Sequence, residues 1–139
     1  MPFFSFFRIG RARTGLGLFA AMPIKRGTWV LEYTGPRLTN AEAEEKERRN
    51  GRYLFEINSR WTVDGSPREN IARYANHSCK PNMEALIVRG RIMLRASKRI
   101  EPGDEMTYNY GRAYRKIFIP VCKCSNCGRH RHGNGRSRD

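Results

Sequence analysis

Short runs of β-branched and aromatic residues, several of them alternating with polar positions, predict a chain built largely of short strands. Gly35 and Pro36 stop the first run, and residues 58–60 and 89–90 separate paired runs in the way that hairpin turns do. The predicted strands cover residues 28–33, 53–57, 61–64, 86–88, 92–96 and 105–110. Short strands at close spacing favour a mostly β fold, whose topology the periodicity alone does not assign.

One stretch departs from this pattern and predicts a short exposed helix. Thr39 and Glu42 have the spacing of a capping box, and alanine is the only apolar residue type in the following residues 41–49. Oppositely charged side chains four residues apart support a helix here. These pairs are Glu42–Lys46, Glu44–Arg48 and Glu45–Arg49. We expect the helix to dock by a narrow edge and to present a wall or a specificity surface; the alternative is a solvated helix without function.

Length and composition limit the answer to one modest globular unit. The 139 residues are 39% hydrophobic and 11% aromatic, enough to fill a single core. The formal net charge of +14 predicts anionic partners or an anion-attracting surface, but it names no function. No apolar run approaches the roughly 18 residues of a membrane span. The phenylalanine-rich residues 1–7 are too short for a signal-peptide core. We therefore expect a soluble, intracellular protein without membrane contact.

The cysteines predict a metal site. In a reducing compartment, closely spaced cysteines are metal ligands more often than disulfide partners. The four are Cys79, Cys122, Cys124 and Cys127. The last three offer three thiolates within six residues, and tetrahedral zinc needs a fourth ligand. We favour Cys79, while His130 and His132 are competing local donors. The alternative is that these are unliganded core cysteines.

The densest group of polar side chains lies in residues 73–82, which predict an irregular loop ending near Pro81. A zinc ion at Cys79 would join this loop to the C-terminal cysteines and contribute to folding. An alternative interpretation is that Cys79 and His77 form a nucleophilic pair. We expect these two side chains to lie on opposite faces of the segment, which disfavours such a pair. The tail from Gly128, rich in arginine and glycine, predicts disorder.

Five motifs in this order resemble the SET-domain protein-lysine methyltransferases. They are Gly-Leu-Gly-Leu-Phe-Ala at 15–20, Glu-Tyr-Thr-Gly at 32–35, residues 73–82 with Asn-His-Ser-Cys at 76–79, Glu-Met-Thr-Tyr-Asn-Tyr at 105–110, and the cysteine cluster. Without them the Gly-x-Gly at 15–17 would indicate only a tight turn before a strand. The resemblance implies several small β-sheets around a knot-like threading. It divides the chain into a SET domain (1–112), a zinc-bound post-SET segment (113–128) and a basic disordered tail (129–139).

The chain departs from the family pattern without losing a catalytic group. Tyr74 stands where Phe is usual, Met106 replaces Leu and Asn109 replaces Asp. The cysteine cluster has a shorter final gap than is common, which bears on the zinc geometry. A cysteine cluster ahead of the SET motifs is absent from the sequence. In this respect the chain resembles the minimal versions of bacteria or viruses.

The resemblance implies methyl transfer from S-adenosylmethionine to a lysine side chain. It assigns Tyr110 as the catalytic tyrosine and Tyr53 as the other tyrosine of the lysine channel. A hydroxyl at Tyr108 favours mono- or dimethylation over trimethylation. The cofactor would be bound by Gly15, Leu16, Gly17, Asn76, His77 and Tyr110. Of these, His77 would act through its backbone without proton transfer, and Glu105 would anchor local hydrogen bonds.

The substrate class follows less directly. The resemblance favours a histone or another basic nucleic-acid-binding protein, such as a nucleoid protein. A chain of +14 repels a free cationic tail, so we expect DNA to hold the substrate nearby. One competing hypothesis is a zinc-stapled nucleic-acid-binding module without activity, which the charge and the arginine-rich tail favour. Another is a methyltransferase-like protein that has lost activity.

Overall fold

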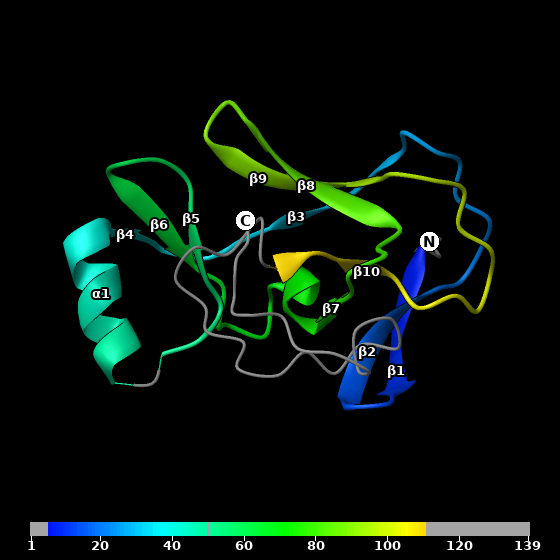
Figure 1. Ribbon diagram of the computed structural model, residues 1–139, viewed down its shortest axis with the longest axis horizontal. Helices are drawn as coiled ribbons and strands as arrows, with labels where there is room; N and C mark the ends of the chain where they lie inside the picture. Colours follow the sequence, from blue (N-terminus) through cyan, green and yellow to red (C-terminus); the bar gives the residue numbers. More distant parts are fainter. Residues whose placement is uncertain (1–5, 50, 111–139) are drawn as a thin grey trace.

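A computed structural model describes residues 6–49 and 51–110. Within them lie ten strands, one α-helix and one 3-10 helix (Figure 1). In chain order these are β1 (Phe7–Ala12), β2 (Gly15–Ala20), β3 (Trp29–Tyr33), β4 (Arg37–Thr39), α1 (Asn40–Arg48), β5 (Leu54–Glu56), β6 (Trp61–Asp64), η1 (Ile71–Tyr74), β7 (Asn76–His77), β8 (Met83–Val88), β9 (Arg91–Ala96) and β10 (Thr107–Tyr108). The predicted mostly β fold is confirmed.

The strands form four small sheets. β1 pairs with β2, β3-β9-β8 and β4-β6-β5 are three-stranded antiparallel sheets, and β7 pairs with β10 in parallel. Figure 1 places α1 and the β4-β6-β5 sheet at one end and the β1–β2 hairpin at the other, with β7 and β10 between them. The parallel pair brings Asn76 beside Thr107 and His77 beside Tyr108. Two segments far apart in sequence therefore meet at the centre.

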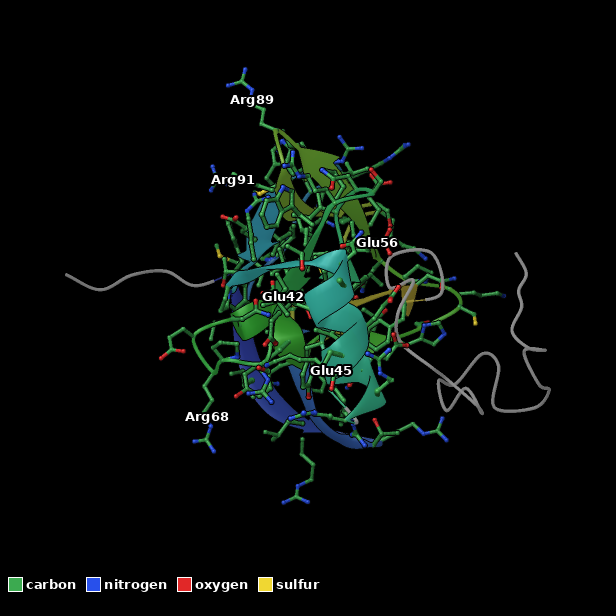
Figure 2. The ribbon with its side chains drawn as sticks, turned by 90° about the vertical axis from the view of Figure 1, so that its left-hand side faces the viewer. Glu42, Glu45, Glu56, Arg68, Arg89 and Arg91 are labelled. Atoms are coloured by element: carbon green, nitrogen blue, oxygen red, sulfur yellow. The ribbon has the colours of Figure 1, made fainter. Side chains whose placement is uncertain are left out.

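The two predicted hairpins and the first predicted strand are confirmed. β5 pairs with β6, and β8 pairs with β9 through a two-residue turn. Arg89 has φ 53° and Gly90 has φ 77°, the left-handed backbone that a tight hairpin turn requires. Figure 2 shows Arg89 extending from the tip of this hairpin, with Arg91 beside it. Arg91 forms an ion pair with Glu32 at 2.6 Å across to β3.

The helix has the predicted cap and the predicted narrow contact. The Thr39 hydroxyl accepts from Glu42 N at 3.1 Å, and the Glu42 carboxylate accepts from Thr39 N at 2.8 Å. Only Ala43 of α1 is buried. Glu45 pairs with Arg49 as expected, but Lys46 does not pair with Glu42. Its ammonium contacts the Asp64 carboxylate of β6 at 2.8 Å, because the cap already holds Glu42. Figure 2 shows Glu42 and Glu45 on this helix.

Three local predictions need correction. The sequence did not predict β1. Residues 15–20 were expected to form a tight turn and a strand, but they form the second strand of a hairpin with β1. The polar segment 73–82 is less irregular than expected, since η1 ends in it and β7 lies within it. The strand predicted over 105–110 covers only Thr107–Tyr108, because its partner β7 is two residues long.

The core lies between the sheets and is built from all of them. The largest fully buried apolar side chains of this core cluster come from β2, β3, β8, β9, β10 and the segments between strands. These are Leu18, Tyr33, Met83, Ile92, Leu94, Met106 and Tyr108, together with Ile24 and Ile100. The segment carrying Asn76 and His77 is thus anchored on both sides by buried residues, which is what a precisely shaped site requires.

Parts of the predicted organisation lie outside the described residues. These are the boundary after residue 112, the post-SET segment 113–128 and the tail 129–139. The knot-like threading stays a prediction, because the described residues contain only the β7–β10 pairing at its centre. In the described residues no helix has the length and apolar character that a membrane crossing demands.

Candidate active site

Tyr110 is held at two points by the polar segment of residues 75–77. Its hydroxyl donates to the backbone oxygen of Ala75 at 2.5 Å, and its backbone N–H donates to Nδ1 of His77 at 3.0 Å. Burial, followed by the influence of Tyr53 and Glu105, raises the pKa of Tyr110 above its ordinary value. The phenol therefore stays protonated at neutral pH. It can orient reactants as a hydrogen-bonding group but does not serve as a base.

The three predicted tyrosines gather around this point. The rings of Tyr108 and Tyr110 lie 5.2 Å apart, and Tyr108 is 1% exposed. Tyr53 is partly buried against the same core cluster that contains Tyr108 and packs against Tyr110. The structure thus brings together the residues that the resemblance assigned to catalysis, although their catalytic roles stay predictions.

Tyr53 adopts a backbone conformation that other residues enforce. Its φ is 64°, a left-handed value that costs a non-glycine residue roughly 1–2 kcal/mol. The Tyr53 carbonyl oxygen accepts from the Tyr33 hydroxyl at 2.7 Å and from Gly65 N at 2.8 Å. A Cβ on Gly65 would lie 2.4 Å from the Tyr33 ring, so glycine is needed there. This strain, fixed by two hydrogen bonds, sets the direction of the Tyr53 side chain.

Arg73 is a candidate functional residue whose contact with Tyr53 the sequence reasoning missed. Its guanidinium carbon lies 4.6 Å from the ring centroid of Tyr53 and 5.4 Å from that of Tyr74. Its buried Nε has no hydrogen-bond partner among the described residues. The Tyr53 hydroxyl is the main cause that raises the pKa of Arg73, against desolvation by burial. A permanent positive charge therefore lies beside Tyr53, and the sequence signal for it was the place of Arg73 at the start of the motif at 73–82.

The glycine motif packs closely against Asn76. The side-chain amide nitrogen of Asn76 donates to the Leu16 carbonyl oxygen at 3.0 Å and to the Glu105 carboxylate at 2.8 Å. A Cβ on Gly17 would meet that carboxylate at 2.7 Å and the Asn76 amide at 3.2 Å. Leu16 itself is 56% exposed, and Gly15 has φ 126° with open space around it. The predicted cofactor residues thus form a contiguous group, and Glu105 has the anchoring role expected of it.

His77 and Cys79 do not diverge as predicted. His77 Nε2 lies 3.4 Å from Cys79 Sγ, because side chains two residues apart in extended backbone lie on the same face. The contact does not make a nucleophilic pair. His77 Nδ1 accepts the Tyr110 N–H, so in the neutral ring the proton lies on Nε2 and the ring has no free lone pair for the thiol.

Cys79 is the one predicted metal ligand among the described residues, and it is half-buried. An N–H directed at its sulfur stabilises a thiolate, which suits the donor set expected for zinc. Cys122, Cys124 and Cys127 lie outside the described residues, as do His130 and His132. No group of three metal-ligating side chains occurs within residues 6–49 and 51–110. The zinc site therefore stays a prediction.

Comparisons with known proteins agree with this geometry. The family described as the SET domain matches residues 15–111. Histone-lysine N-methyltransferase 2D of Homo sapiens is 38% identical over 105 residues, which are 69% of this chain and 2% of that protein. An H3 lysine-4 specific histone-lysine N-methyltransferase of Schizosaccharomyces pombe is 38% identical over 123 residues, which are 81% of this chain and 13% of that protein. The chain therefore spans a small part of the length of these relatives.

Solved structures give the same result. A humanized mutant of the Chaetomium thermophilum Polycomb Repressive Complex 2, bound to an inhibitor, superposes with a TM-score of 0.69 at 33% identity, covering 80% of this chain and 15% of that one. ctPRC2 in an autoinhibited conformation bound to S-adenosylmethionine gives a TM-score of 0.67 at 32% identity over 80% of this chain and 16% of that one. Motifs, fold and relatives agree, and the chain belongs to the SET-domain family.

Proposed function

We propose that this chain is a protein-lysine N-methyltransferase that uses S-adenosylmethionine. The observation that carries the proposal is the fixed position of Tyr110, whose neutral hydroxyl and backbone N–H are both bound by residues 75–77. Relatives named histone-lysine N-methyltransferases, with 38% identity, support it. The chain spans only a small part of the length of those proteins.

The site suits an amine that must lose its proton before it attacks. A lysine with its ordinary pKa of about 10.4 needs about 4.6 kcal/mol to become neutral at pH 7. Buried aromatic rings disfavour the ammonium, and so does the Arg73 charge beside Tyr53. Both effects lower the pKa of an incoming lysine without a basic side chain. Tyr110 is protonated and cannot be that base, so its role is to align the amine with the methyl group.

The glycine motif and Asn76 fit the cofactor in the close approach that their backbone allows. Gly15 has open space around it, and Gly17 lets the Glu105 carboxylate and the Asn76 amide approach the backbone beside the exposed Leu16. When bound, S-adenosylmethionine supplies the electrophilic methyl of a sulfonium. Gly15, Leu16, Gly17, Asn76 and the His77 backbone would hold it. Cys79 with Cys122, Cys124 and Cys127 would hold one structural zinc ion.

The proposed substrate is a basic protein with an exposed lysine, most simply a histone or a nucleoid protein. The names of the relatives favour a histone. A net charge of +14 opposes the approach of a free cationic tail, so we propose that DNA presents the substrate. The buried Tyr108 hydroxyl next to Tyr110 favours one or two methyl groups over three.

The test is transfer of labelled methyl groups to candidate basic proteins, free and bound to DNA, followed by mass spectrometry of the modified lysine. We expect labelling at a lysine, with faster labelling of the DNA-bound substrate and a dependence on salt. Equal rates on free and DNA-bound protein, insensitive to salt, would contradict the DNA-presented substrate. No labelling of any basic protein would contradict the activity.

The charge also supports a second candidate, a nucleic-acid-binding module without activity. Calorimetry separates the two. A methyltransferase gives saturable heat with S-adenosylmethionine, whereas a pure nucleic-acid binder gives heat with DNA alone.

A further inference from the structure

The imidazole of His77 lies between Tyr110 and Cys79. Nδ1 accepts the backbone N–H of Tyr110 at 3.0 Å, and Nε2 lies 3.4 Å from Cys79 Sγ. The connection is possible because β7 pairs in parallel with β10, which places His77 opposite Tyr108 and its ring near Tyr110. The sequence interpretation gave His77 a backbone role only.

These contacts determine which ring nitrogen carries the proton. A backbone N–H can only donate, so Nδ1 must offer a lone pair to Tyr110. A neutral imidazole has one N–H, which must therefore lie on Nε2 and point at the Cys79 sulfur. Addition of a second proton would remove the acceptor for Tyr110. The Tyr110 backbone thus selects the Nε2–H tautomer.

The ring also restrains Tyr110 by packing. The His77 and Tyr110 rings meet edge to face with centroids 5.5 Å apart. The Tyr110 hydroxyl is bound by Ala75, two residues before His77. These three contacts from residues 75–77 restrain the tyrosine, and the two that the His77 ring makes connect it to Cys79.

We propose that the His77 side chain is a positioning residue for Tyr110, held as the Nε2–H tautomer, and that it links the Cys79 sulfur to the Tyr110 backbone. Its meaning for catalysis rests on the proposed function of Tyr110. The consequence is that anything that fixes Cys79, including a metal ion, also restrains the catalytic tyrosine.

Three substitutions of His77 test the two hydrogen bonds of its ring separately. His77→Asn keeps a carbonyl oxygen near the place of Nδ1, and His77→Gln keeps an amide N–H near the place of Nε2. His77→Phe keeps the ring contact and loses both bonds. The main measurement is amide hydrogen exchange at Tyr110. The Met106 N–H, which donates to the Leu18 oxygen at 2.7 Å, reports on the integrity of the fold.

In the wild-type protein we expect nitrogen NMR to show the Nε2–H tautomer. The Tyr110 amide should exchange at least ~10-fold faster in His77→Phe and His77→Gln than in the wild type, and at a near-wild-type rate in His77→Asn. The Met106 amide should be unchanged in all of them. Zinc bound to the protein, measured by chelator competition, should be lost faster in His77→Asn and His77→Phe than in His77→Gln.

An Nδ1–H tautomer in the wild type would overturn the proposal. So would a Tyr110 amide that is as protected in His77→Phe as in the wild type. If His77→Phe exposes the Met106 amide and therefore fails to fold, the wild-type tautomer and the comparison of Asn with Gln decide the question. Identical exchange at Tyr110 in those two variants would also overturn it. None of these measurements needs methyl transfer, so an inactive chain with the expected exchange pattern would refute the proposed function and leave the link intact.

Discussion

The Tyr110 hydroxyl donates a hydrogen bond to the backbone oxygen of Ala75 at 2.5 Å, and Ala75 immediately precedes the Asn76-His77 pair of β7. The proposed catalytic tyrosine is therefore attached to the same segment as two of the proposed cofactor residues. A shift of this segment therefore moves the residues proposed to bind the methyl donor together with the tyrosine proposed to align the acceptor lysine. Alignment between them is consequently preserved when the surrounding sheets move slightly.

Replacement of Arg73 by methionine should shift the pH profile of activity. Loss of the positive charge beside Tyr53 raises the pKa of the incoming lysine, so the rise of kcat/KM with pH should move to higher pH. We expect a roughly tenfold lower kcat/KM at pH 7, recovered at alkaline pH. Arg73→Lys keeps the charge and should keep most of the profile. A profile of unchanged position in Arg73→Met would show that the charge does not act on the lysine.

Gly17→Ala should weaken binding of S-adenosylmethionine. The added Cβ would meet the Glu105 carboxylate at 2.7 Å and would displace the Asn76 amide, at 3.2 Å. We expect a roughly tenfold higher Kd by calorimetry, about 1.4 kcal/mol. Gly10→Ala is the matched control, since Gly10 lies opposite Gly17 in the β1–β2 register. Its Cβ would first meet the movable end of the Arg8 side chain, so this variant should bind like the wild type.

The Lys46–Asp64 pair should make stability depend on acid pH. Burial alone would raise the pKa of Asp64, but hydrogen bonds from Lys46 and Ser66 outweigh it and lower this pKa below its ordinary 3.8. A lowered native pKa gives stability that is present above the unfolded-state pKa and is lost as pH falls through the native one. Urea denaturation should therefore show a decline below about pH 4. In Lys46→Met the decline should be smaller, and the loss at neutral pH at most about 1 kcal/mol, because Lys46 is half exposed.

An equal acid dependence in Lys46→Met and the wild type would assign the lowered pKa of Asp64 to the Ser66 hydrogen bond instead. Arg99→Met is a suitable control for the loss of a surface charge. Arg99 forms a solvent-exposed ion pair with Glu101, and we expect the stability of Arg99→Met to depend on acid pH as that of the wild type does.

Native mass spectrometry should detect one zinc ion per chain, and Cys79→Ser should lose it. The half-buried Cys79, whose sulfur lies 3.4 Å from His77 Nε2, is the fourth ligand that we propose. Treatment with a chelator should destabilise the wild type and leave Cys79→Ser unaffected. If His130→Ala loses the metal while Cys79→Ser retains it, the fourth ligand is a histidine.

Features that depend on neighbouring residues in sequence were predicted well. The Thr39–Glu42 cap needs only a three-residue spacing, and the Arg89-Gly90 turn needs only residues that accept a left-handed backbone. β1 escaped prediction because Arg8, Gly10 and Arg11 hide its alternation, and its stability comes from pairing with β2. Strand formation there is decided by a partner and not by local preference.

The site was predicted as a set of residues but not as a set of contacts. The motifs named Tyr53, Tyr110 and His77, yet the left-handed Tyr53 backbone and its stacking on Arg73 depend on Tyr33 and Gly65, which are remote in sequence. The His77–Cys79 contact was misjudged even though it is local. A bacterial or viral origin stays a prediction.

The most direct measurement is single-turnover methyl transfer by the wild type and by Tyr110→Phe, each loaded with labelled S-adenosylmethionine. The account predicts that both proteins bind the cofactor, because phenylalanine keeps the ring and backbone of Tyr110, and that Tyr110→Phe transfers the methyl at least ~100-fold more slowly, because the aligning hydroxyl is gone. Transfer by Tyr110→Phe at the wild-type rate, or a wild-type chain that binds no S-adenosylmethionine, would contradict it.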